Sequence, residues 1–172
     1  MSEASYKDIF IAFAREHIAL AEPLVFAMGF AEGVPVLSLL VPSTPLFLGI
    51  GAAHAAAGGQ FWTVWLAASI GAWVSDIAMY LLARHYKNGI LEFRFFARHP
   101  DWWPRGHALF ARWGILAVVS GKFLGVLRPF IPAIAGAVEM PMRYFLPASL
   151  IASLAWGGVF LGAGHGIKWI AD

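Results

Sequence analysis

Two long stretches of this chain carry no charged side chain. Asp, Glu, Lys and Arg are all absent from the 43 residues that run from Gly33 to Ser75 and from the 21 residues that run from Tyr144 to Gly164. An apolar segment of about 20 residues is long enough to cross a lipid bilayer as a helix. Each stretch can therefore hold a membrane-spanning segment, and the pattern predicts an all-α integral membrane protein.

The first apolar region, residues 24–58, is interrupted repeatedly by glycine and proline. The interruptions are Gly29, Gly33, Pro35, Pro42, Pro45, Gly49, Gly51 and Gly58, and Gly59 follows directly. A proline inside a helix removes a hydrogen bond and costs about 3 kcal/mol. Lipid offers no water to replace that bond, so broken backbone at membrane depth is stable only where protein covers it or a polar cavity adjoins it. We therefore expect residues 24–58 to form a re-entrant hairpin with its tip near Pro42 and Pro45; the alternative is two short tilted helices that both cross.

Residues 61–83, by contrast, predict an uninterrupted transmembrane helix, with tryptophans at one end and Arg84 and Lys87 at the other as interfacial anchors. Residues 108–140 repeat the glycine- and proline-rich pattern and predict a second re-entrant hairpin, and residues 144–167 predict a second transmembrane helix. Each half of the chain is thus a broken hairpin followed by one spanning helix. Since a single crossing separates the two hairpins, they open to opposite sides, which is the inverted repeat of many secondary transporters.

The N-terminal region completes a single membrane domain over residues 1–172. Residues 5–22 are expected to form a helix that lies partly in the interface, because Asp8, Arg15 and Glu22 recur every seven positions as a polar stripe. An ordinary core helix is the alternative. The N-terminus lacks the basic stretch, apolar core and cleavage site of a signal peptide.

Residues 87–107 are rich in basic side chains and predict a cytoplasmic loop. Six of the twelve Lys and Arg side chains lie in this region or close to it, and only Glu92 and Asp101 oppose them. The six are Arg84, Lys87, Arg94, Arg98, Arg105 and Arg112. Short loops with an excess of Lys and Arg remain on the cytoplasmic side of a membrane. Residues 58–60 are accordingly expected on the opposite face.

The composition supports a membrane protein and excludes other classes. Hydrophobic residues make up 60% of the chain, charged residues make up 13%, and the mean hydropathy is +0.70, whereas soluble domains contain about 25% charged residues. Without cysteine there is no disulfide and no thiolate metal site, and the histidines lack metal-ligand spacing. The net charge of +2 is too small to indicate nucleic acid. Since no nucleophile elbow, phosphate loop or nucleotide fingerprint is present, we expect no metal, no cofactor and no enzymatic activity.

Four charged side chains fall inside the predicted membrane region. Glu32 leads into the first hairpin, Asp76 lies in the first spanning helix, and Lys122 and Arg128 lie in the second hairpin. A charge at the bilayer centre costs about 2.5–3.5 kcal/mol on insertion scales, so such residues usually face a cavity or a partner. If the tips of the hairpins meet, the Glu32 carboxylate faces the two cations. A static ion pair is the alternative, and for Asp76 a simple structural bond is favoured because Arg84 lies two turns away.

These residues also form motifs, and through them the sequence resembles the DedA family, the SNARE-associated or VTT-domain membrane proteins. The resemblance covers about residues 28–166. The matching positions are Glu32 and Pro42; then Asp76, Tyr80, Arg84 and Gly89; then Lys122, Phe123, Gly125, Arg128, Pro132 and Gly136; and finally Met140, Phe145 and Trp156. The departures from the family pattern are Thr44 in place of an acid, Ser75 in place of Gly, Lys122 in place of Arg, and Gly125 in place of Pro.

The resemblance implies lipid transport. Members of the family are implicated in moving polyprenyl phosphate carriers or phospholipids across bacterial membranes, which implies a flippase or scramblase of the inner membrane for a lipid with an anionic headgroup. In that function Lys122 and Arg128 bind phosphate, Glu32 titrates or competes for these cations, and Thr44 belongs to the same substrate site.

The other membrane charges, Asp76 and Arg84, are expected to serve proton coupling or structure. The missing acid at Thr44 leaves coupling to protons open, and the identity of the lipid and the formation of a homo-oligomer also stay open. Many family members have a further helix after the matching region. Two other functions remain as alternatives: a non-transporting scaffold that shapes the bilayer or assembles a partner, and an integral lipid phosphatase, for which no nucleophile and base are recognisable.

Overall fold

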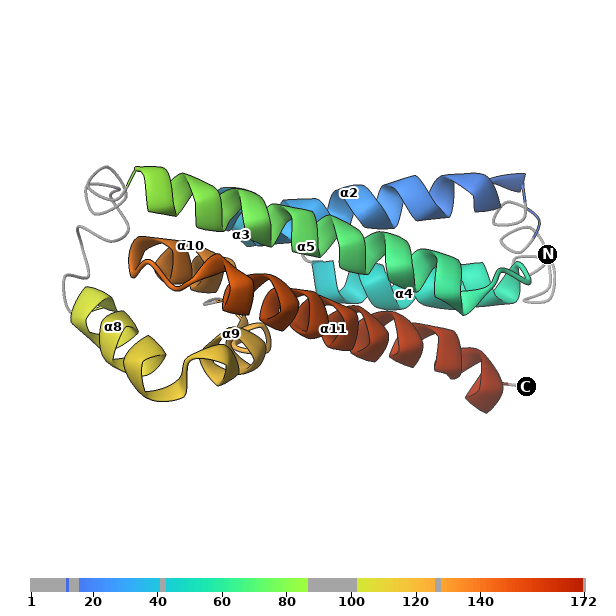
Figure 1. Ribbon diagram of the computed structural model, residues 1–172. Coiled ribbons are helices and arrows are strands. Elements are labelled where there is room, and N and C mark those ends of the chain that lie inside the picture. The colour runs from blue at the N-terminus through green and yellow to red at the C-terminus, as the bar shows by residue number, and fades with distance from the viewer. Residues whose placement is uncertain (1–11, 13–15, 41–42, 87–101, 126–127, 172) are drawn as a thin grey trace.

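The computed structural model describes residues 12, 16–40, 43–86, 102–125 and 128–171 (Figure 1). Every regular element in these ranges is helical, which confirms the predicted all-α class for this part of the chain. In chain order the elements are the 3-10 turn η1 (Ile18–Leu20) and the helices α2 (Ala21–Gly33), α3 (Pro35–Leu40), α4 (Ser43–Ala56), α5 (Phe61–His85), α8 (Trp102–Trp113), α9 (Ile115–Gly121), α10 (Phe130–Ala137) and α11 (Met142–Ala171).

Two of these helices, α5 and α11, are long and apolar enough to cross a membrane. Each helix has 25 residues in this range, and an 18-residue window within it has a mean hydropathy of 1.5 in Phe61–His85 and 1.6 in Met142–Gly166. At 1.5 Å per residue, a helix of this length extends about 37 Å, which exceeds the hydrocarbon core of about 30 Å. The last turn of α5 contains Arg84 and His85, whose basic side chains suit the negative end of the helix dipole.

Short helices occupy the regions that are rich in glycine and proline. α2 ends at Gly33 because Pro35 disfavours helical backbone at the preceding residue, and Val34 is accordingly extended, with φ −93° and ψ 117°. The chain turns after α4 at Gly58, whose φ of +86° is a conformation that glycine adopts without strain. Gly114, with φ +47°, separates α8 from α9. Local backbone chemistry therefore explains where these helices end.

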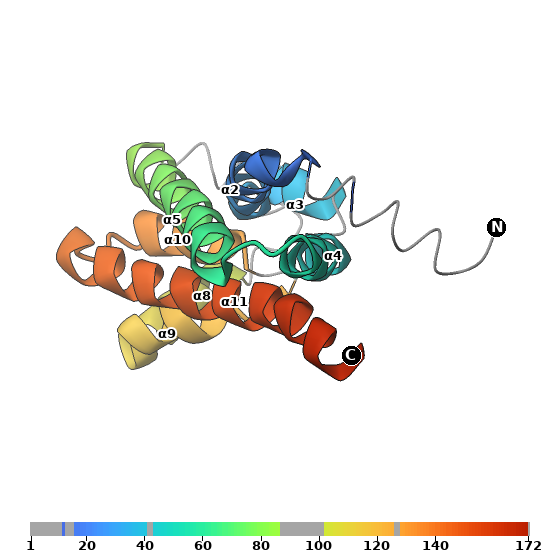
Figure 2. The same ribbon diagram turned by 90° about the vertical axis from the view of Figure 1, so that its right-hand side faces the viewer.

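Several of the short helices end or begin in the middle of the bundle. In Figure 1, α2 runs from the right-hand end toward the middle, and α4 begins in the middle and returns to the right-hand end. α10 runs from the interior to the left-hand end, and α5 and α11 extend past these short helices in opposite directions. α2 and α10 pack against α5, α4 and α9 pack against α11, and α5 and α11 pack against each other. Figure 2 shows α2, α4, α5 and α11 side by side in a view along the bundle.

Glycine permits the closest approaches between short and long helices. A Cβ atom on Gly136 of α10 would overlap the carbonyl oxygen of Tyr80 in α5. A Cβ atom on Gly51 of α4 would lie 2.8 Å from the carbonyl oxygen of Leu161 in α11. Backbone therefore contacts backbone at both crossings, as in membrane helices that pack through small residues.

We expect Gly136→Ala to lower the free energy of unfolding by about 1–3 kcal/mol, because the added methyl group overlaps the Tyr80 carbonyl and forces α10 away from α5. Gly49→Ala is the matched control, since a Cβ atom at Gly49 of α4 would have no atom within 4 Å and alanine favours a helix more than glycine does. Unfolding titrations in detergent micelles measure both variants. Equal stability of the two variants would contradict the close contact at Gly136.

Large apolar side chains cover much of the outer surface. Those that are exposed include Leu24, Leu66, Ile70, Leu81, Leu82, Leu116, Ile151 and Val159. An apolar surface of this extent is unusual on a soluble monomer, but it is the surface that lipid chains contact in a membrane. Among the described residues, by contrast, the buried interior contains four charged side chains and several serines.

Two predicted segments extend beyond the described residues. The predicted interfacial helix, residues 5–22, lies largely outside the described ranges, and within it α2 begins at Ala21. The predicted basic loop, residues 87–107, lies outside them up to residue 101. The remainder of that loop is helical, because α8 begins at Trp102.

Candidate functional site

The four charged side chains of the predicted membrane region are all buried, and they form two ion pairs. Glu32, Asp76, Lys122 and Arg128 are between 3% and 7% exposed. Arg128 pairs with Glu32, and Lys122 pairs with Asp76. The two negative and two positive charges therefore balance one another. Burial of this kind is stable only because every charge has a partner of opposite sign.

The pair of Arg128 and Glu32 joins elements that are far apart in the sequence. Glu32 is the last residue but one of α2, and Arg128 lies directly before Pro129, the residue at the N-terminal cap of α10. The Nη1 atom of Arg128 donates a hydrogen bond to Oε2 of Glu32. Both helices end or begin at this point, so the first and second broken regions are tied together in the interior.

Within the part of the chain that the structure describes, the other two nitrogens of the Arg128 guanidinium have no hydrogen-bond partner. Nε and Nη2 are both buried and unpaired. These two atoms share one edge of the planar group, where their N–H bonds form the fork that carboxylate and phosphate oxygens accept. A buried donor without a partner costs about 1–3 kcal/mol. The edge is therefore suited to an anion with two acceptor oxygens.

An aromatic side chain packs against the same guanidinium. The Cζ atom of Arg128 lies 3.8 Å from the centroid of the Trp156 ring, which is a cation–π contact. Trp156 is buried, and the ring of Phe47 from α4 meets it edge to face, with centroids 4.9 Å apart and an interplanar angle of 89°. Trp156 of α11 therefore contacts Arg128 directly, and Phe47 of α4 supports Trp156 in turn.

The pair of Lys122 and Asp76 is more completely bonded. Oδ2 of Asp76 accepts hydrogen bonds from Nζ of Lys122, from Oγ of Ser149 at 2.7 Å and from Oγ of Ser153 at 3.4 Å. Asp76 belongs to α5, Lys122 caps the end of α9, and both serines belong to α11. This group therefore ties three helices together.

The sequence-predicted residues thus fall into different surroundings. Arg128 faces Glu32, as expected for hairpin tips that meet, but Lys122 contacts Asp76 instead. Arg84 donates to Oη of Tyr80 at 2.5 Å and to the Met140 carbonyl oxygen at 3.4 Å. Arg84 does not pair with Asp76, whose carboxylate forms its ion pair with Lys122. Thr44 lies in the first turn of α4, and its side chain is outside the described part of the structure.

Sequence reasoning missed four residues around these pairs: Phe47, Ser149, Ser153 and Trp156. Trp156 matches the family pattern, but the sequence predicts no role for it at the site. A signal was available, because positions 149, 153 and 156 follow the spacing of one helix face and put two hydroxyls and an indole on an otherwise apolar helix. Among the described residues, no group of three His, Asp or Glu side chains could hold a metal ion.

Comparison with known proteins identifies the domain. Residues 41–166 match the VTT domain. The chain is 30% identical over 142 residues to inner membrane protein YohD of Escherichia coli K12, an alignment that covers 83% of this chain and 72% of YohD. It is 28% identical over 173 residues to inner membrane protein YghB of the same organism, with 97% of this chain and 77% of YghB covered.

A third relative is longer than this chain. Inner membrane protein YabI of E. coli K12 is 26% identical over 132 residues, which are 77% of this chain and 52% of YabI, so the chain spans about half of that relative. No solved structure matches the chain. Since these relatives are named inner membrane proteins and two helices here are long enough to span a bilayer, the chain is an integral protein of the inner membrane. The VTT domain covers most of the described bundle, including both spanning helices and three of the four buried charges, and the chain belongs to the DedA family of VTT-domain membrane proteins.

Proposed function

We propose that the protein moves a lipid with an anionic headgroup, such as a polyprenyl phosphate or a phospholipid, across the inner membrane as a flippase or scramblase. The observation that carries the proposal is the free edge of Arg128, a buried cation with Nε and Nη2 unpaired. Phosphate presents two oxygens that match this edge. In a bilayer, the phosphate groups of lipids are the abundant anions of this kind.

We propose that residues 24–58 and 108–140 form two re-entrant hairpins related by an inverted repeat. The contact of Gly51 with the Leu161 carbonyl and the contact of Gly136 with the Tyr80 carbonyl support this relation. The number of positions between Gly51 and Gly136 is nearly the same as the number between Tyr80 and Leu161. In each half, the second arm of the hairpin therefore packs against the spanning helix of the other half, as a two-fold axis in the membrane plane requires.

The direction of the short helices favours an anion in the interior. α4 begins at Ser43 in the middle of the bundle, and α10 begins two residues after Arg128 (Figure 1). The N-terminus of a helix is the positive end of its dipole, and broken transporter helices direct such ends at anionic substrate groups. Phe47 in the second turn of α4 contacts Trp156, the ring beside Arg128. We propose that Thr44, in the first turn, belongs to the same anion site.

We propose that Glu32 gives up its contact with Arg128 when a phosphate binds, because the buried charges must stay balanced. The buried charges sum to zero before a headgroup arrives, so an added phosphate leaves excess negative charge in a region of low dielectric. Binding is therefore favoured when Glu32 releases Arg128 and takes up a proton. Asp76 is less suited to this exchange, because Lys122 and two serine hydroxyls bond its carboxylate. Proton-coupled transport would use Glu32 in this way.

The remaining charges are proposed to have structural roles. Lys122 is occupied by Asp76, and this group fastens α9 to α5 and α11. Arg84 and Tyr80 both bond the Met140 carbonyl oxygen, which fixes the connection between α10 and α11 to α5. We therefore propose that Arg128 is the principal phosphate ligand and that Lys122 supports the fold around it.

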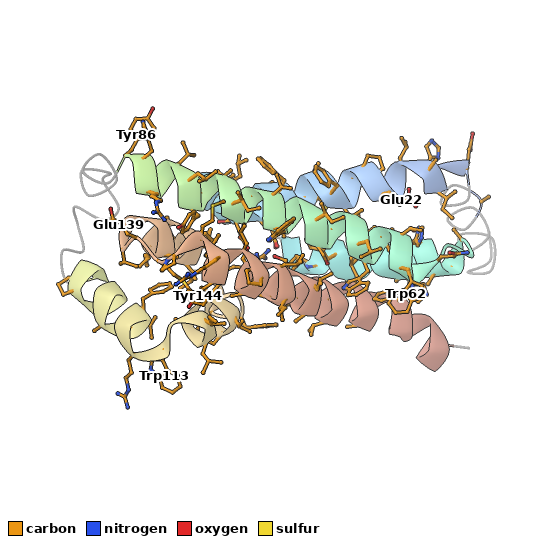
Figure 3. The ribbon with its side chains drawn as sticks, viewed as in Figure 1. Glu22, Trp62, Tyr86, Trp113, Glu139 and Tyr144 are labelled. Carbon is orange, nitrogen blue, oxygen red and sulfur yellow. The ribbon has the colours of Figure 1, made fainter. Side chains whose placement is uncertain are left out.

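We expect cysteines at Glu22 and Trp62 to react from one side of the membrane and a cysteine at Tyr86 to react from the other. Figure 3 shows Glu22 and Trp62 at one end of the bundle and Tyr86 at the opposite end. The basic region after Tyr86 assigns that end to the cytoplasm. The chain has no cysteine of its own, so labelling of intact cells with an impermeant maleimide measures each single variant. Reaction of Glu22→Cys and Trp62→Cys from opposite sides would contradict the first re-entrant hairpin.

Lipid movement in proteoliposomes tests the function itself. Fluorescent phosphatidylglycerol and phosphatidylcholine, together with a polyprenyl phosphate, are reconstituted with matched amounts of protein. We expect faster movement of the anionic lipids than of phosphatidylcholine. If no lipid moves, the transport proposal is wrong, and a scaffold that shapes the bilayer or assembles a partner becomes the better explanation.

A further inference from the structure

Trp156 gives Arg128 a second partner that carries no charge. The distance of 3.8 Å from Cζ to the ring centroid is well inside the cation–π range of about 6 Å. Trp156 is 3% exposed, so the contact is shielded from water. Cation–π contacts are strongest when they are shielded in this way. The contact also leaves Nε and Nη2 of Arg128 without a partner. It therefore does not compete for the edge that a phosphate would use.

The Trp156 ring is itself held by neighbouring aromatic side chains. Phe47, which is fully buried, meets the ring edge to face with centroids 4.9 Å apart. Phe160, one turn further along α11, lies 5.3 Å away at an interplanar angle of 46°. A ring fixed from α4 and from its own helix cannot follow the cation if the cation moves. Trp156 is thus a rigid surface next to Arg128.

We propose that Trp156 is the positioning residue of the anion site and that it holds the Arg128 guanidinium in place while its hydrogen-bond partner changes from Glu32 to the lipid phosphate. This inference rests on the proposed function. Between the two bonded states, the Glu32 carboxylate has been released and the phosphate has not yet bound. An indole does not titrate and is not displaced by an anion, so it stabilises the cation throughout this exchange. The residue acts on substrate only through Arg128.

The affinity for a phosphate-bearing probe tests this role without any need for transport. The probe is dihexanoyl phosphatidic acid, titrated calorimetrically into the full chain in detergent. We expect Trp156→Leu to raise the Kd about tenfold, and Trp156→Phe to raise it about threefold or less, because a phenyl ring retains a weaker cation–π contact. The matched control is Phe145→Leu, since Phe145 is a fully buried aromatic residue of α11 that stacks on Tyr80, 4.3 Å away. Its Kd is expected to equal that of the native chain.

A spectroscopic measurement follows the contact directly. The eight tryptophans are replaced by 5-fluorotryptophan, and the resonance of Trp156 is assigned from its loss in Trp156→Phe. We expect the probe to shift this resonance in the native chain and not in Arg128→Lys. Inorganic phosphate is expected to cause a smaller shift at the same concentration. A shift of equal size would overturn lipid as the ligand, although it would support the positioning role.

The outcomes separate this inference from the function on which it rests. A native Kd in Trp156→Leu would overturn the positioning role and leave the proposed function intact. An equal loss of affinity in Phe145→Leu and Trp156→Leu would also overturn it, because general loosening of α11 would explain both. If the native chain neither binds the probe nor shows a shift, both the anion site and its positioning residue are wrong.

Discussion

Replacement of Arg128 by lysine is expected to reduce lipid transport by about 10- to 100-fold while the protein still inserts and folds. Lysine keeps the positive charge and can still pair with Glu32, but it has no planar edge with two parallel donors. Hydrogen bonds to charged groups contribute about 1.5–3 kcal/mol each, and about 1.4 kcal/mol corresponds to tenfold. The loss of one such bond to phosphate accounts for the expected range. Initial rates in vesicles at matched protein amounts measure it.

Two companion variants separate phosphate binding from a static ion pair. Lys122→Arg serves as the control, because arginine stands at this position in the family pattern and Lys122 bonds Asp76 rather than the free edge. The charge swap Glu32→Arg with Arg128→Glu tests the pair itself. If Arg128 only balances Glu32, the swap restores much of the stability and Arg128→Lys is mild. Near-normal transport by Arg128→Lys would therefore rule out the two-donor phosphate contact.

Removal of Asp76 is expected to cause the largest loss of stability in the chain. Asp76→Ala leaves the buried Lys122 ammonium without its carboxylate, and breaking a buried ion pair from one side costs about 3–5 kcal/mol. Lys122→Met is expected to cost less, because Ser149 and Ser153 still donate to the remaining carboxylate. The free energy of unfolding, measured by denaturant titration in micelles, gives both values.

The double variant Asp76→Leu with Lys122→Met completes the cycle. Since apolar side chains of similar volume often replace a buried ion pair without loss, we expect its stability to return to within about 1 kcal/mol of the native chain. Lipid transport should then be largely retained at matched protein amounts, because Arg128 and Glu32 are untouched. A stable double variant that no longer transports would instead assign Lys122 to the substrate or Asp76 to proton coupling.

The charge-free stretches alone determined the class of the protein. Long apolar runs have few stable environments besides a bilayer, so the sequence was sufficient to predict helices and a membrane. The ends of some helices could also be predicted from the positions of proline and glycine. Pro35 forces Val34 out of helical geometry, and Gly58 adopts a positive φ. These are local effects of backbone chemistry, and they depend little on the rest of the chain.

The pairing of the charges was decided by the tertiary structure. The sequence indicated that Glu32 and Arg128 could meet, and they do. It also predicted a contact of Lys122 with Glu32 and allowed a bond between Arg84 and Asp76. In the structure, Lys122 pairs with Asp76 instead. Arg84 donates a hydrogen bond to Tyr80. Sequence spacing describes neighbours on one helix, but it does not specify which faces of separate helices pack together.

The surroundings of Arg128 depend even more on packing. Nothing in the local sequence brings Trp156 of α11 to 3.8 Å from the Arg128 guanidinium or places Phe47 of α4 against that indole. Nor does it reveal that Glu32 bonds only Nη1 and leaves one edge of the guanidinium free. The amino-acid sequence determined that this protein enters a membrane and where its helices break, because hydrophobicity and backbone preference are local properties. Only the tertiary structure decided which charge is saturated and which retains a free edge, because hydrogen-bond partners from distant segments are selected by how the helices pack.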